Sequence, residues 1–199
     1  MKTLVLVTFV IGLGSASIAG EYGSPEISVI SPVAVTATSN WDGFYVGGSI
    51  SQLFGVQTNS VALPEYDLNG PFVGGFAGYN VHNGGLIYGA EAAYSLGSAH
   101  EDGTPDYQFT DVLDVKARLG FGFGDALVYG VAGWSSANWD DSGVDYTASG
   151  FNAGVGVDYL ISDSFFVGAE YLFRDLKEDV SAQFEAPLQS VQVRAGFNF

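Results

Sequence analysis

The chain has 199 residues, about one domain, with 22 acidic and six basic residues and a net charge of −16. This acidic balance argues against nucleic acid as a partner, because phosphate binding requires basic surface. Cysteine is absent. An exported form would therefore be stabilised by main-chain hydrogen bonds rather than by disulfides.

The N-terminus has the pattern of a secretory signal peptide. A basic start is followed by the apolar run Leu4–Leu13 and by small residues at a cleavage position, Ser17–Ala19. We expect a signal peptide over residues 1–19. A membrane-anchor helix is the alternative, but this run is shorter than the ~20 residues that span a bilayer. We expect residues 20–40 to be an extended periplasmic segment.

The remaining chain, residues 41–199, alternates apolar and polar residues with a period of two, which predicts β-strands. No apolar run there approaches the ~18 residues of a helical span, whereas interleaved apolar residues are typical of a transmembrane barrel. The eight predicted strands are Trp41–Phe54, Gly70–Val81, Leu86–Gly97, Phe109–Phe123, Ala126–Asn138, Ser149–Ile161, Phe165–Arg174 and Leu188–Phe199.

The connections between these strands are alternately short and long. Gly124-Asp125 is one of three tight turns, and Gly97–Gln108 and Asp175–Pro187 are long polar stretches. This alternation is typical of outer-membrane barrels, which have short periplasmic turns and longer extracellular loops. The fold class predicted is all-β, an eight-stranded antiparallel up-and-down barrel.

Most predicted strands separate an apolar face from a polar one, but Gly70–Val81 and Ala126–Asn138 carry apolar residues on both faces. In the fourth strand Leu113, Val115, Ala117 and Leu119 oppose Asp114, Lys116 and Arg118. A soluble lipocalin-type barrel would show the same period with its apolar face inward. The alternating turn lengths, the aromatics near strand ends and a last strand that reaches Phe199 favour the membrane barrel.

Four segments resemble the small barrels of alphaproteobacterial outer membranes, called porin-like or immunogenic surface antigens, which are similar to the opacity proteins and the OmpA barrel domain. They are Trp41–Ile50, Phe72–Asn80, Tyr88–Tyr94 and Gly168–Phe173. The resemblance implies an outer-membrane location, contact with outer-membrane lipid and lipopolysaccharide, and insertion by the barrel-assembly machinery. It also implies that the aromatic C-terminus, Phe199, is an assembly signal.

Four of the five basic residues after residue 19 fall on polar strand faces that also carry four acids. The eight residues are Glu91, Asp114, Lys116, Arg118, Asp158, Glu170, Arg174 and Arg194. Counted from the periplasmic ends, Glu91, Arg118, Glu170 and Arg194 are expected to form one layer, with the other four close by. Because an eight-stranded barrel has space only for its own side chains, we interpret this set as a paired ionic plug. A rearranging gate is the alternative.

The remaining polar residues favour no enzyme. His82 lies at a turn and His100 in a loop, neither beside a suitable serine, and no cofactor or metal site is predicted. Acidic residues concentrate in the long connections, as in Asp140-Asp141-Ser-Gly-Val-Asp145, which lacks the spacing of a calcium loop. The sequence thus predicts a structural outer-membrane protein. Adhesion to a host or surface ligand through these acidic loops, or low-conductance channel activity, are the alternatives.

Overall fold

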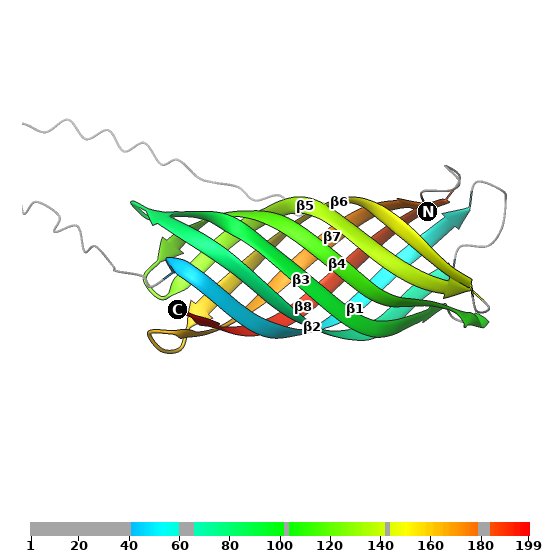
Figure 1. Cartoon of the computed structure of the whole chain (residues 1–199), viewed down its shortest axis with the longest axis horizontal. Coiled ribbons are helices and arrows are strands. Elements are labelled where there is room, and N and C mark those ends of the chain that lie inside the picture. Colours follow the sequence, from blue (N-terminus) through cyan, green and yellow to red (C-terminus); the bar gives the residue numbers. More distant parts are fainter. Residues whose placement is uncertain (1–40, 60–65, 102–103, 142–143, 179–183) are drawn as a thin grey trace, which may run out of the picture. The chain divides into compact units, whose positions relative to one another are not determined.

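The protein folds into a closed eight-stranded antiparallel barrel, described here from a computed structural model that covers residues 41–59, 66–101, 104–141, 144–178 and 184–199 (Figure 1). Each strand pairs with its neighbours in sequence, and β1 closes the barrel by pairing with β8. The strands are β1 Gly43–Asn59, β2 Tyr66–Asn83, β3 Leu86–Glu101, β4 Thr104–Phe123, β5 Ala126–Asp141, β6 Val144–Leu160, β7 Phe165–Glu178 and β8 Phe184–Asn198. The predicted fold class is confirmed. The described residues contain no helix able to cross a membrane.

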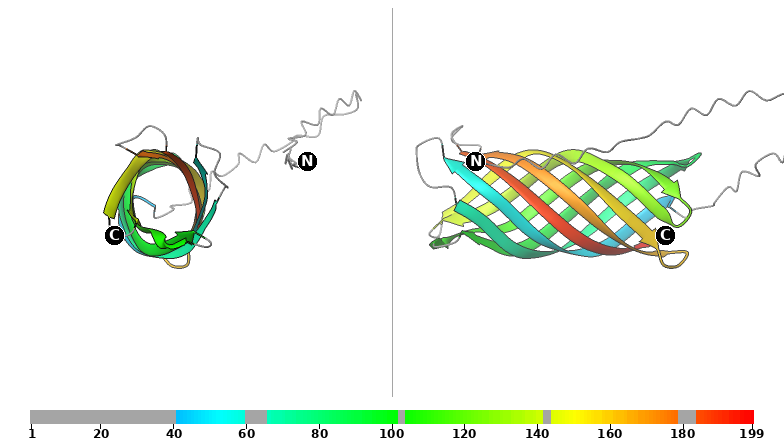
Figure 2. Two further views of the ribbon diagram at one scale, coloured as in Figure 1. Left: turned by 90° about the vertical axis from the view of Figure 1, so that its right-hand side faces the viewer. Right: turned by 180° about the vertical axis from the view of Figure 1, so that it is seen from behind.

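Three tight turns join the strands at one end of the barrel, which we call the turn end; the opposite end is the loop end (Figure 2). Gly84 and Gly85 form a two-residue turn with φ values of 61° and 95°, and Gly124 begins another with φ 63°. Such left-handed conformations match the twist of a hairpin and favour glycine. In outer-membrane barrels short turns face the periplasm, so the loop end faces the exterior.

The expected strand boundaries were wrong at the loop end. Most residues of the predicted connections Gly97–Gln108 and Asp175–Pro187 belong to strands, and only residues 102–103 separate β3 from β4. The hydrogen-bonded ladder between neighbouring strands is built from backbone groups. It therefore continues through polar residues after the alternation of apolar and polar side chains has ended. The hairpins therefore extend beyond the apolar part of the wall.

In the strands that separate an apolar face from a polar one, the apolar face forms the outer wall of the barrel. Leu113, Val115 and Leu119 of β4 are exposed there, whereas Asp114, Lys116 and Arg118 are buried inside. The same holds for the other faces assigned from sequence. A soluble barrel with an apolar lumen and a polar wall is therefore excluded, since this wall requires hydrocarbon around it.

Exposed aromatic side chains are concentrated toward the two ends of this wall. Phe44, Tyr79, Tyr88, Phe121, Tyr159, Phe165 and Phe197 lie toward the turn end, and Tyr94, Trp134, Phe151 and Tyr171 toward the loop end. Between them the wall is mainly Val, Ile, Leu, Ala and Gly. Two aromatic girdles around an aliphatic belt are typical of a bilayer-spanning barrel, because aromatic rings favour the headgroup level.

Candidate functional site in the lumen

The structure places all eight charged residues singled out in the sequence inside the barrel, each at most 6% exposed. Six of them are linked by salt bridges into one group, which we call the central ion cluster. Its members are Glu91, Lys116, Arg118, Asp158, Glu170 and Arg194. Three acids and three bases leave it with no formal net charge, as required of charges removed from water.

Lys116 and Arg194 each join the two glutamates of the cluster. Lys116 Nζ lies 2.9 Å from Glu91 Oε1 and 2.5 Å from Glu170 Oε1. Arg194 donates from Nη2 to Glu91 Oε2 at 2.5 Å and from Nη1 to Glu170 Oε2 at 3.1 Å. These contacts connect β3, β4, β7 and β8 across the lumen, and charge-assisted bonds of this kind are the stronger class of hydrogen bond.

Arg118 is held by an acid and by two tyrosines. Its Nη2 pairs with Asp158 Oδ2, and its Nη1 donates to Tyr45 Oη at 3.2 Å. Its guanidinium carbon also lies 3.6 Å from the centre of the Tyr129 ring. A desolvated guanidinium over an aromatic face gains cation–π energy in addition to its ion pair.

The tyrosine hydroxyls complete the coordination of the glutamates. Tyr45 Oη donates to Glu91 Oε2 at 2.9 Å, and Tyr129 Oη donates to Glu170 Oε2 at 3.1 Å. These neutral donors satisfy carboxylate lone pairs that the cations leave open, which lowers the cost of burying the acids.

Asp114 and Arg174 form a separate pair nearer the loop end. Arg174 donates from Nε and Nη2 to the two oxygens of Asp114 at 2.8 and 2.7 Å. Ser135 Oγ donates to Asp114 Oδ1 at 2.5 Å, and Arg174 Nη1 donates to Ser190 Oγ at 2.9 Å. This bidentate pair is also neutral overall.

The four residues expected to share one layer, Glu91, Arg118, Glu170 and Arg194, all belong to the central ion cluster, which also includes Lys116 and Asp158. The direct partners within the cluster could not be obtained by counting residues from the strand ends. Glu91 lies opposite Lys116 in the β3–β4 ladder, while Arg118 lies opposite Gly89. Arg118 Nη1 is 3.6 Å from Glu91, and its closer partner is Asp158. Strands in a barrel are tilted and staggered, so the direct partner of a charged side chain depends on the register of the whole sheet.

Two apolar clusters fill much of the remaining lumen, and they were not predicted from the sequence. One extends from the turn end into the central ion cluster, where Phe76 lies under Arg194 and Tyr129 under Arg118, and the other lies at the loop end. The turn-end cluster contains Trp41, Tyr45, Phe76, Ile87, Leu127, Tyr129, Val131, Leu160, Phe166 and Leu172. The loop-end cluster contains Leu53, Leu68, Phe72, Ala99, Phe109, Val112, Ala137, Trp139, Ala148, Leu176 and Leu188. The available signal was the apolar character of both faces of β2 and β5, whose inward residues include Phe72, Phe76, Leu127 and Val131.

Several inward glycines make room for the rings of these clusters. A Cβ at Gly47 would meet the ring of Phe76, one at Gly78 the ring of Tyr45, and one at Gly156 the ring of Tyr129. In each pair the ring lies over the backbone of an adjacent strand. These glycines thus allow large aromatics to fill a narrow lumen.

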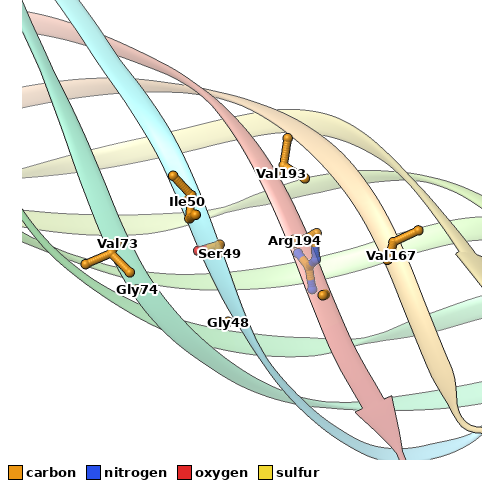
Figure 3. A pocket seen from close by; sticks show the side chains of 9 residues that line it. Gly48, Ser49, Ile50, Val73, Gly74, Val167, Val193 and Arg194 are labelled. Carbon is orange, nitrogen blue, oxygen red and sulfur yellow. The ribbon is translucent and has the colours of Figure 1, made fainter.

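Consecutive residues of one strand face lipid and lumen, as Figure 3 shows where β7, β8, β1 and β2 meet. Ile50, Val73 and Val193 line a shallow apolar groove of about 390 Å³ on the outer wall. Arg194, the next residue along β8, is 1% exposed. The groove lies in the lipid-facing belt, so its surroundings in a membrane are hydrocarbon.

His82 and Asp175 are the polar residues of the predicted turns and loops that the structure places outside the lumen. His82 lies at the turn end of β2, where its Nε2 accepts from the backbone N–H of Gly85 at 3.3 Å and its own N–H donates to Asp42 Oδ1 at 2.9 Å. It therefore supports a hairpin turn. Asp175 is exposed on the outer wall. The side chains of His100 and of Asp140, Asp141 and Asp145 lie outside those that the structure describes.

Residues 27–199 match the family described as outer membrane protein beta-barrel domain. A 31 kDa outer-membrane immunogenic protein of Brucella melitensis is 27% identical over 243 aligned positions, covering 100% of this chain and 99% of that protein. A 22 kDa outer membrane protein of Rhizobium leguminosarum is 27% identical over 71% of this chain and 67% of its own length.

Solved structures show the same fold. Neisserial surface protein A (NspA) superimposes with a TM-score of 0.52 at 17% identity, covering 79% of this chain and 98% of that one. Ail, the attachment invasion locus protein of Yersinia pestis, gives a TM-score of 0.50 at 16% identity, with coverages of 79% and 99%. With the lipid-facing wall and the matched family, these findings show that the chain belongs to the outer-membrane β-barrel family and resides in the outer membrane of a Gram-negative bacterium.

Proposed function

We propose that this protein is a closed, non-conducting barrel that contributes to the structure and integrity of the outer membrane. The observation that carries the proposal is the content of the lumen, in which two neutral ionic groups are packed against an apolar cluster that begins at the turn end and a second one at the loop end. An ion would have to cross both apolar clusters without hydration and then separate paired charges, and apolar constrictions of this kind block conduction by excluding water. This role requires no catalytic group.

Conductance tests the proposal directly. We expect purified wild-type protein to show no stepwise current in planar bilayers under conditions in which a porin gives steady channels. The double variant Arg118→Met/Asp158→Asn, which removes one ion pair and keeps the lumen neutral, should remain silent, because both apolar clusters persist. Steady porin-sized channels from the wild type would make solute passage the leading function. If only the double variant formed channels, the paired charges, and not the apolar clusters, would be what blocks conduction in the wild type.

Phe199 is proposed as the assembly signal. Its backbone N–H donates to Phe44 O at 2.8 Å, and its side chain, 73% exposed, makes an edge contact with Phe197 with ring centroids 5.3 Å apart. Few internal contacts depend on this ring, so deleting Phe199 should lower the amount inserted in the outer membrane several-fold. Phe123→Ala, which removes another exposed ring from the turn end, should leave it nearly unchanged. Equal surface amounts for the deletion and the wild type, quantified on intact cells at native expression, would contradict this role.

Recognition at the cell surface is the second candidate function. The observation in its favour is that the hairpins continue past the loop-end aromatic girdle; β7, for example, runs seven residues beyond Tyr171 to Glu178. Extended hairpins would present the acidic loop-end residues to the exterior. A binding screen on whole cells with and without the protein would reveal such a ligand.

A further inference from the structure

We propose that a row of four residues across the seam between β1 and β8 acts as a clasp that holds the barrel wall closed. The row consists of Phe166 of β7, Gly196 of β8, Gly47 of β1 and Phe76 of β2, which pair laterally in that order. The four strands lie side by side, as Figure 3 shows. We call these four residues the seam clasp.

The two rings of the seam clasp meet above its two glycines. A Cβ on Gly196 would overlap the ring of Phe166, and a Cβ on Gly47 would overlap the ring of Phe76. Each ring therefore lies across the seam strand next to its own strand, and the two ring centroids are 6.2 Å apart. This separation is within the range of favourable aromatic pairs, so side chains of β7 and β2 contact each other over the closing ladder.

Three further contacts cross the same seam. The ring of Phe166 also packs against Trp41 and Tyr45, with centroids 5.8 and 6.1 Å apart. The guanidinium carbon of Arg194, on β8, lies 3.9 Å from the centre of the Phe76 ring, on β2. Phe166 is 1% exposed and Phe76 is 6% exposed, so these contacts are made away from water. The two rings thus tie β7 and β8 to β1 and β2 independently of the main-chain hydrogen bonds.

The seam is the place in the barrel where such a tie has the largest effect. The β1–β8 ladder joins the first and last strands of the barrel, whereas every other ladder joins consecutive strands. Bringing together distant parts of a chain costs more loop-closure entropy than forming a hairpin, and an opened seam would leave unpaired main-chain groups in hydrocarbon. Side-chain contacts that span the seam offset these costs. Glycine is required at positions 47 and 196, because a Cβ at either would keep the rings apart.

Hydrogen–deuterium exchange of the purified full barrel in detergent, resolved by strand with mass spectrometry, tests the seam clasp. We expect Phe166→Ala to accelerate amide exchange in β1 and β8 about tenfold and to leave β4 and β5 nearly unchanged. The matched control is Phe72→Ala, because this ring also lies over a glycine, Gly97, but within the β2–β3 hairpin. The control should leave exchange in β8 close to that of the wild type. Heat-dependent migration on gels verifies that each variant is folded.

A reversible covalent bond across the seam separates seam opening from general loosening of the barrel. Gly48 and Ala195 are directly paired, and a Cβ on Gly48 would have no neighbour closer than 3.5 Å. The natural chain has no cysteine, so Gly48→Cys/Ala195→Cys introduces a single possible disulfide. Oxidation should abolish the effect of Phe166→Ala on exchange in β1 and β8, and reduction should restore it.

Exchange in β1 and β8 of Phe166→Ala equal to that of the wild type would overturn the proposal. Equal acceleration in β4 and β5, or an acceleration that the disulfide does not reduce, would also overturn it, because the ring would then stabilise the barrel as a whole. Phe166→Leu, which keeps most of the apolar volume without the ring, provides the same test if the alanine variant does not fold. The proposal rests on neither proposed function, and none of these results bears on conductance or on Phe199 as an assembly signal.

Discussion

Replacing Arg118 with methionine is expected to destabilise the barrel by about 3–5 kcal/mol. The substitution removes the direct partner of Asp158 and leaves the central ion cluster with one excess negative charge. Breaking a buried pair by removing one member typically has this cost, because the remaining charge is neither solvated nor neutralised. Urea unfolding in lipid vesicles, followed by tryptophan fluorescence, measures the change in the free energy of unfolding.

A double-mutant cycle identifies the partner of Arg118. Combining Arg118→Met with Asp158→Asn should cost clearly less than the sum of the two single changes, with a coupling of about 1–3 kcal/mol. The matched control combines Arg118→Met with Asp114→Asn. That combination also restores a neutral lumen, but Asp114 pairs with Arg174 in the other layer.

The control should be close to additive if direct contact determines the energy. Equal coupling in both cycles would mean that only the total charge of the lumen matters. Strict additivity in the Asp158 cycle would show that the two side chains are not partners. Glu91, which was expected in the same layer as Arg118, should couple less strongly with it because the nearer cations of Glu91 are Lys116 and Arg194.

Replacing Gly156 with valine should have a similarly large effect, for a steric reason. A Cβ at this position would overlap the ring of Tyr129. The displaced ring would lose its stacking with Arg118, at 3.6 Å, and its hydrogen bond to Glu170, at 3.1 Å. Overpacking a well-filled interior costs about 1–3 kcal/mol by itself, and the loss of the two polar contacts adds to it.

Gly130 provides the matched control. It faces the outer wall, and an added Cβ there would approach backbone oxygens no closer than 3.8 Å. Gly130→Val should therefore leave the free energy of unfolding almost unchanged. Adding Tyr129→Ala to Gly156→Val should recover part of the stability, since the clash is removed. If Gly156→Val and Gly130→Val behaved alike, the lumen would be less tightly packed than the structure indicates.

Much of the fold could be predicted from local patterns. The two-residue turns at Gly84–Gly85 and Gly124–Asp125 and the alternation in β3, β4, β6 and β7 were sufficient to predict eight antiparallel strands. The positions at which the strands end at the loop end of the barrel were not predictable in this way. Polar residues there continue the backbone ladder as far as Glu101 and Asp141, and a side-chain pattern contains no information about main-chain hydrogen bonds beyond the lipid.

The charged residues illustrate what the sequence by itself determined. Alternation with a period of two placed Arg118, Lys116 and Asp114 on the polar face of β4. Because the chain has few other basic residues, their position on polar strand faces indicated a charged lumen. Side-chain direction along a strand is a local property, so it could be read without knowing the rest of the fold.

Which residues meet across the lumen was decided only by the tertiary structure. Closure of β1 on β8 and the stagger of the tilted strands bring Lys116 beside Glu91, pair Arg118 with Asp158, and separate Asp114 and Arg174 into their own layer. Closure of the barrel also decides that Phe76 and Leu127 face inward. Their strands, β2 and β5, are apolar on both faces, so the side-chain pattern could not decide this. Height around a barrel depends on the shear of the whole sheet, and a single strand carries no information about the shear.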